Sequence, residues 1–219
     1  MKLKKIASLM LAGVMAVSML AGCEGSANSG ENNGEENQVV AASVADYANS
    51  LLTTAQKNVF EFKNSADLTA ALQKIAGDST KYGSEDIKNA YESPVTTVAY
   101  EDKIQSDLKD DLDLDVVNTN QVMTATKKGT QAYGYFYALS GKLTEASAVQ
   151  LIVKRFVDGV YSRDFFPATC AATSGTLKCD YTAEISAVKV TAPDTDKNSA
   201  WIVGIVVTQT ATEVSNAGA

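Results

Sequence analysis

The stretch AWIVGIVVTQT, residues 200–210, decides how the rest of the fold is arranged. Alternate residues of a β-strand point to opposite faces of the sheet. A strand with one face toward water alternates apolar and polar residues, whereas this stretch is apolar on both faces. The sequence therefore predicts that it forms a strand at the centre of a sheet.

The preceding segment, residues 181–191, is predicted to pair with this central strand. A polar turn at residues 193–198 joins the two. Alternation along the segment is regular as far as Ala187, after which Val188 and Val190 take the opposite phase. Such a slip predicts a β-bulge or bend near Ala187.

Three further strands are predicted earlier in the chain. One covers residues 95–104, and residues 116–126 and 131–139 form a hairpin around Lys127-Lys128-Gly129-Thr130. The acidic residues 107–115 between them are predicted to form a turn or a helical turn.

Four helices are predicted from periodicity and capping residues. Apolar residues at helical spacing from Val40 to Val59 indicate one long helix, the longest of the folded part. A second helix runs from an N-cap at Ser65 to Gly77, and a third begins at Ser84 and stops before Pro94. The fourth follows the cap residue Thr144, with a buried face of Ala148, Val149, Ile152, Val153, Phe156, Val157 and Val160.

These elements predict an α+β fold, with N-terminal helices and one later helix packed on a mainly antiparallel sheet of about five strands. Residues 39–211 are assigned to a single globular domain, within which residues 39–93 could form a helical sub-lobe. Residues 212–219 are expected to be a loose tail.

Composition limits the classes of partner. The chain is 45% hydrophobic, which is typical of a folded domain rather than of disorder. Its first 22 residues include three lysines and no acidic residue, so the remainder has 16 basic and 26 acidic residues, a net charge of −10. This charge argues against nucleic-acid binding, which needs lysine and arginine to displace counterions. It also argues against a surface that lies flat on anionic lipid.

The first 22 residues have the pattern of an export signal. Lys2, Lys4 and Lys5 precede an apolar run from Ile6 to Leu20. A basic segment followed by a short apolar segment and small residues is typical of a signal peptide, and the run is too short for a convincing membrane-spanning helix.

The sequence Leu20-Ala21-Gly22-Cys23 closes this leader and resembles the lipobox of bacterial lipoproteins. The resemblance covers only the leader. It implies that the Cys23 thiol receives a diacylglyceryl group and that cleavage leaves Cys23 as the first residue, with a palmitate-type lipid anchor. Two acyl chains hold a protein on a bilayer far better than one does.

Residues 23–38 are then the lipidated cysteine and a flexible polar tether rich in Gly, Ser, Asn and Glu, with a span of roughly 20 Å. The expected location is the outer face of a bacterial cytoplasmic membrane, in an envelope of Gram-positive type rather than an outer membrane. The expected partners are the lipid bilayer, through the acyl chains on Cys23, and an envelope protein or glycan.

Two cysteines remain after Cys23. Disulfides persist outside the cytoplasm, so Cys170 and Cys179 are predicted to form a disulfide around residues 171–178, with two free thiols as the alternative. A catalytic cysteine–histidine pair is excluded because the chain contains no histidine.

The most distinctive surface candidate is the row Tyr133, Tyr135 and Tyr137, which share one face of a strand. Tyrosine offers an apolar ring and a polar tip, so the row could stack on sugar rings or on a partner protein. In the alternative interpretation, the row packs beneath the long first helix.

No catalytic residue, metal ligand or cofactor site is predicted. EF-hand loops starting at Asp111 or Asp194 lack the required glycine and glutamate. The chain contains no Gly-x-Ser-x-Gly element, Walker A motif or dinucleotide fingerprint.

The expected function is therefore non-catalytic binding or scaffolding at the cell envelope. One alternative is an envelope hydrolase with paired carboxylates, which a strongly raised carboxyl pKa in a cleft would favour. The other is a small solute-binding or glycan-binding lipoprotein, which two comparable lobes around a cleft would favour.

Overall fold

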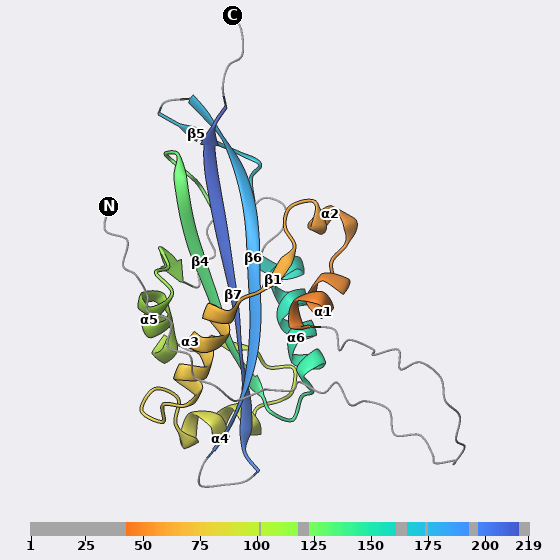
Figure 1. Cartoon of the computed structure of the whole chain (residues 1–219). Helices are drawn as coiled ribbons and strands as arrows, with labels where there is room; N and C mark the ends of the chain where they lie inside the picture. Colours follow the sequence, from red (N-terminus) through yellow and green to blue (C-terminus); the bar gives the residue numbers. More distant parts are fainter. Residues whose placement is uncertain are drawn as a thin grey trace, which may run out of the picture. The chain divides into compact units, whose positions relative to one another are not determined.

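The predicted central strand is central in the structure. The computed structural model describes residues 43–100, 102–117, 123–160, 166–173, 175–192 and 197–214. In these ranges the sheet has the order β1-β6-β7-β4-β2. Strand β7 (Ser199–Glu213) lies between β6 (Gly175–Thr191) and β4 (Gly129–Ser140) and is antiparallel to both (Figure 1). The prediction for residues 200–210 is confirmed.

Four short strands complete this sheet. Strand β1 (Phe62–Asn64) pairs parallel with β6, and β5 (Thr169–Ala172) pairs antiparallel with it. On the other side, β2 (Ala99–Tyr100) is antiparallel to β4 and β3 (Val116–Val117) is parallel to it. The sheet is mixed, its three long strands are antiparallel, and the predicted α+β class is confirmed.

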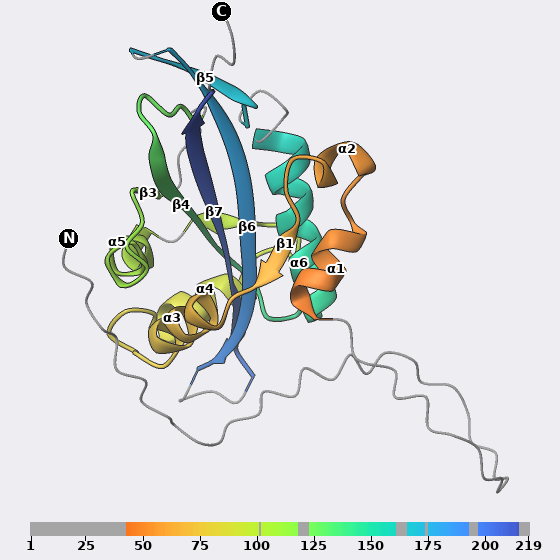
Figure 2. The ribbon, with the colours of Figure 1, turned by 45° about the horizontal axis from the view of Figure 1, so that its top comes forward.

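Helices cover both faces of the sheet (Figure 2). Helix α1 (Val44–Ser50) and helix α6 (Glu145–Lys154), which continues into the π-helical segment η1 (Arg155–Val160), pack on one face, with the short α2 (Thr54–Lys57) following α1. Helices α3 (Ala66–Ala76), α4 (Ser84–Glu92) and α5 (Asp102–Asp111) pack on the other. Strand β7 therefore needs apolar residues on both faces, with Val203 in one core and Ile202 in the other.

The predicted bulge near Ala187 is wrong. The pairing of β6 with β7 runs without interruption from Leu177 opposite Glu213 to Thr191 opposite Ser199. The change of phase arises because α3 covers the second face at this point, where Ser186 and Thr69 are joined by a 2.8 Å hydrogen bond between their hydroxyls. Val190 is then buried in the core on that side.

The predicted hairpin of residues 116–126 and 131–139 is also wrong. Val116 pairs with Tyr133 in a parallel ladder, which a hairpin cannot produce. The strand expected at residues 95–104 shortens to β2, because α5 begins at Asp102. Ile104 and Leu108, four residues apart on one helical face, are both fully buried there.

The long first helix expected up to Val59 is divided in two. Thr53 starts a new helix, since its side chain accepts from the Gln56 amide and the Gln56 side chain accepts from the Thr53 amide. The longest α-helix in the described residues is instead α3, capped by Ser65 as predicted. The predictions of α4 and of α6, with its cap at Thr144, are confirmed.

The described residues belong to one compact unit, in which the stretch 43–93 makes no separate lobe. Helices α1 and α3 of that stretch contribute to the cores on opposite faces of the sheet. Strand β7 continues to Glu213, slightly past the expected start of the tail. The predicted leader, Cys23 and the tether lie outside the described residues. Within the described residues, no helix is both long and apolar enough to cross a membrane.

Candidate functional site

The tyrosine row is part of the core and does not form an exposed binding face. Tyr133, Tyr135 and Tyr137 expose 6%, 0% and 1% of their surface. Their face of β4 lies under α6 and η1, where the ring of Tyr135 meets that of Phe156 edge-on at 5.3 Å between centroids. Burial of large aromatic rings is what a sheet covered by helices requires, and it removes these side chains from any ligand outside.

Cys170 and Cys179 come together, although the predicted disulfide is not formed in this structure. Both are buried free thiols, and their sulfur atoms lie 3.0 Å apart, beyond the ~2.05 Å of a disulfide bond. In the ladder of β5 and β6, Cys170 lies opposite Leu177, so the two cysteines are diagonal rather than direct partners. Burial, together with the hydrogen bond between the thiols, raises the pKa of Cys179 to about 12.

A polar network adjoins the two sulfur atoms. The Gln209 side-chain amide donates to the Met123 carbonyl (2.8 Å) and to the Tyr181 hydroxyl (2.9 Å), and that hydroxyl donates to the Pro167 carbonyl (2.8 Å). Burial raises the pKa of Tyr181 well above its usual value, and burial likewise raises the pKa of Tyr133. These hydroxyls and the Cys179 thiol are protonated at neutral pH, so they hold structure together and offer no ready nucleophile.

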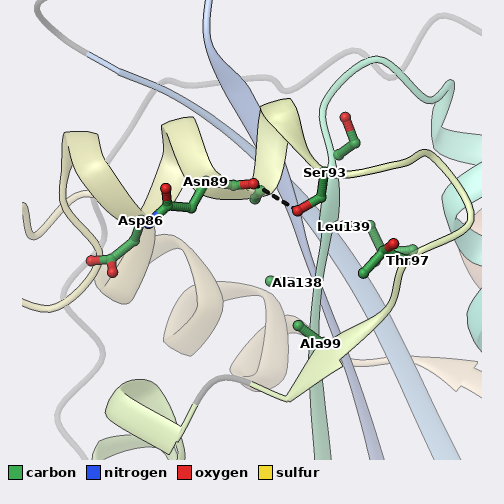
Figure 3. A pocket seen from close by; sticks show the side chains of 9 residues that line it. Asp86, Asn89, Ser93, Thr97, Ala99, Ala138 and Leu139 are labelled. Carbon is green, nitrogen blue, oxygen red and sulfur yellow. Dashed lines mark hydrogen bonds between the residues drawn. The ribbon is translucent and has the colours of Figure 1, made fainter.

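A cavity with polar and apolar walls lies between α4 and the strands β2 and β4 (Figure 3). Its volume is about 230 Å³. Helix α4 contributes one wall, the turn before β2 another, and β4 the floor, with the lining residues Asp86, Asn89, Ala90, Ser93, Thr97, Ala99, Ala138, Leu139 and Ser140. We call this cavity the α4 cleft.

Local sequence builds the walls of the α4 cleft. At the start of α4, the Asp86 carboxylate accepts from the Gly83 amide (3.1 Å). At its end, the Ser93 hydroxyl donates to the Asn89 carbonyl (2.7 Å), and Pro94 then prevents the helix from continuing. The Thr97 amide bonds to the Pro94 carbonyl (2.8 Å), which turns the chain back toward β2. Asp86 and Thr97 thus lie at opposite ends of the cleft (Figure 3).

The floor exists because small residues meet across two strands. Ala99 of β2 lies directly opposite Ala138 of β4, and neither side chain fills the space beneath α4. The Ser140 hydroxyl donates to the Tyr91 carbonyl (3.0 Å), which joins the strand to the helix end. The Lys142 ammonium lies 4.6 Å from the centroid of the Tyr91 ring, just beyond this contact.

The chemistry of the α4 cleft suits recognition better than catalysis. Its polar groups are hydroxyls, one amide and one carboxylate, which bind a solute by hydrogen bonding over an apolar floor. Among the described residues that line the cleft, Asp86 is the only carboxylate, so they do not supply the carboxylate pair of a glycosidase. Burial raises the pKa of Glu145 on α6, yet Glu145 does not line the cleft.

Sequence reasoning missed the α4 cleft. Asp86, Asn89 and Ser93 are spaced three and four residues apart, which places them along one side of a helix. That polar stripe was the available signal. The pairing of Ala99 with Ala138 could not be predicted from sequence, because β2 and β4 are far apart in the chain.

A second hollow lies beside α2 and α6 and is more apolar. Two adjoining cavities of about 240 and 270 Å³ share Thr53, Gln56 and Val157. Their other walls include Phe60, Phe166, Leu51 and Val153. The side chains of Gln56, Gln150 and Lys154 add polar groups to this largely apolar lining, and Lys154 is the charged group among them.

The described residues contain no cluster of three or more histidine, cysteine, aspartate or glutamate side chains that could hold a metal ion. No protein-family model, curated protein or solved structure matches the chain. Functional inference therefore depends on the geometry of the sites above.

Proposed function

We propose that this protein is a lipid-anchored binding protein on the outer face of a bacterial cytoplasmic membrane, and that its ligand is a small hydrogen-bonding solute held in the α4 cleft. The observation that carries the proposal is the composition of that cleft. Hydroxyl, amide and carboxylate groups surround a floor of alanine side chains in a cavity of about 230 Å³.

The same composition favours binding over hydrolysis. A two-carboxylate mechanism needs an acid and a second carboxylate on either side of the scissile bond. Asp86 is the single acid among the described residues of the α4 cleft, and it already accepts a hydrogen bond from the Gly83 amide as part of the helix cap. The lining residues that the structure describes include neither a nucleophile–base pair nor a carboxylate pair.

The anchor is proposed from the leader. A diacylated Cys23 followed by a polar tether would hold the domain outside the membrane, where it meets solutes and glycans of the envelope. In the test of this part, the Cys23→Ala variant moves from the membrane fraction to the soluble fraction and loses the lipid mass. Unchanged membrane retention and mass would refute the anchor.

The binding proposal is tested by filling the α4 cleft from its exposed side. Ala99→Leu extends an exposed side chain into the cavity and leaves the buried Ala138 untouched. Ala146→Leu on α6 adds the same atoms away from the cleft and serves as the matched control. Ligand-observed NMR against a set of monosaccharides, amino acids and polyols should find a solute that binds the native and control proteins.

Binding of that solute should be lost in Ala99→Leu alone. If a solute binds all three proteins equally, the α4 cleft is not its site. If none of the tested solutes binds the native protein and crosslinking captures an envelope protein instead, the scaffolding alternative takes its place.

A further inference from the structure

The two buried thiols occupy positions from which a small movement would join them. The sulfur atoms of Cys170 and Cys179 are 3.0 Å apart, about 1 Å more than the length of a disulfide bond. Both side chains belong to a small cluster with Ala125, Leu177 and Ala211 at the end of the sheet where β5 lies (Figure 1). They are the two cysteines of the described residues, and no other thiol competes for either one there.

The two cysteines differ in how firmly their strands are held. Strand β5 pairs with β6 alone in the described residues, over four residue pairs from Thr169 to Ala172. Cys179 lies on β6, which is paired with β7 as well, where Cys179 is opposite Ala211. Short edge strands open at a small fraction of the global unfolding free energy. Opening of β5 therefore exposes Cys170 first, while Cys179 stays in the sheet.

We propose that Cys170 and Cys179 are an exchangeable dithiol, which a disulfide-bearing oxidant converts into a covalent link that holds β5 on β6. The structure contains the reduced form. The proposal is independent of the α4 cleft and adds a redox-dependent latch at the opposite end of the long strands.

The exchange has two steps. The Cys170 thiolate, exposed by opening of β5, attacks one sulfur of an oxidant RS–SR; the S–S bond of the oxidant breaks and RS⁻ leaves and takes up a proton. As β5 moves back toward β6, the Cys179 thiolate attacks the Cys170 sulfur of the mixed disulfide and expels the second RS⁻, which is also protonated. Two cysteine thiols are oxidised to one disulfide, and one RS–SR is reduced to two RSH.

Formation of the link would change the dynamics of one segment. In the reduced form, residues 166–172 are held by the four-pair ladder, by the bond from Tyr181 to the Pro167 carbonyl and by the contact between the thiols. A covalent bond at Cys170 removes the open states of β5 that let the oxidant in. The disulfide would then resist reduction, because a reductant also reaches it only through the open states of β5.

The test uses the full chain, purified with reductant and then incubated natively with oxidised glutathione. Peptide mapping should assign a Cys170–Cys179 bond, with a mass lower by two hydrogen atoms. Amide hydrogen exchange of residues 168–173 should slow at least several-fold in the oxidised form, while exchange in α3 stays unchanged. In Cys179→Ser, the first step proceeds and the second cannot, so a glutathione adduct should accumulate on Cys170.

Two results would overturn the proposal. One is that both thiols remain free after prolonged oxidation, both natively and in mild urea that promotes local opening. The other is that the bond forms but hydrogen exchange in β5 does not change, which would show that the disulfide does not restrict the opening of β5. The Cys170→Ser variant separates oxidation from misfolding, since it should retain the reduced exchange pattern and form no adduct at position 170.

Discussion

Gln209 and Tyr181 lie directly opposite each other on β7 and β6, and the Gln209 amide donates a 2.9 Å hydrogen bond to the Tyr181 hydroxyl. Gln209 is only 1% exposed, although it lies between Thr208 and Thr210 near the end of β7. Its second bond, to the Met123 carbonyl, secures the segment that precedes β4. A polar pair thus joins three separate parts of the chain at the end of the sheet that holds the thiols.

Removal of that amide should be costly. Gln209→Ala leaves the Met123 carbonyl without this donor and opens a cavity, so the free energy of unfolding should fall by about 2–3 kcal/mol. Urea denaturation followed by circular dichroism measures the change. The exposed Gln150 on α6 provides the control, because Gln150→Ala should stay within about 0.5 kcal/mol of the native protein. Equal effects of the two substitutions would contradict a structural role for the Gln209 network.

Alkaline pH should destabilise the fold. Burial raises the folded-state pKa of Cys179 from 9.0 to about 12, and that of Tyr181 above 10.0. Below about pH 8 these groups are protonated in both states and their contribution is fully present. At higher pH the unfolded chain releases its protons first, so stability is lost as pH rises toward the folded-state pKa values.

The urea midpoint should therefore fall between about pH 8 and about pH 11. Tyr181→Phe removes one of the two groups and should make the fall shallower, at the cost of lower stability at pH 8 through loss of the bond to Pro167. A midpoint that stays constant over this range would show that neither group is shielded from ionisation as the structure indicates.

The thiols should be nearly inert toward alkylation in the native, reduced protein. Alkylation requires the thiolate, and both side chains are buried, with the Cys179 pKa raised to about 12. Iodoacetamide at about pH 8 should label Cys170 slowly in the native protein, through opening of β5, and should label Cys179 only after denaturation. Intact mass spectrometry reports the number of adducts over time. Rapid native labelling of Cys179 would contradict its burial.

Gly141 should tolerate no side chain. It follows β4, where its amide donates to the Ser199 carbonyl (2.9 Å), and a Cβ added there would overlap the Ser199 backbone. Gly141→Ala should lower the unfolding free energy by about 1–3 kcal/mol by forcing the ends of β4 and β7 apart. At Gly77 an added Cβ would lie 3.3 Å from the Gln73 carbonyl oxygen, so Gly77→Ala should cost less. The reverse order would show that the β4–β7 contact is looser than described.

Long-range packing explains the main differences between prediction and structure. Val188 and Val190 broke the expected alternation because helices lie on both faces of β6, and no local pattern shows which helix covers which face. The parallel pairing of Val116 with Tyr133 depends on where α5 ends. The tyrosine row was identified correctly as one face of a strand, but whether it met water or a helix depended on α6.

Local signals determined the helix ends and the central strand. The sequence alone determined the caps at Ser65 and Thr144 and the end of α4 before Pro94, because each follows from interactions within a few residues. It also determined the place of residues 200–210 in the middle of the sheet, because that strand is apolar on both faces. Only the tertiary structure decided which small residues left the α4 cleft open and that Cys170 and Cys179 meet diagonally. Those outcomes depend on strand register, which pairs residues far apart in the chain and which a local pattern does not encode.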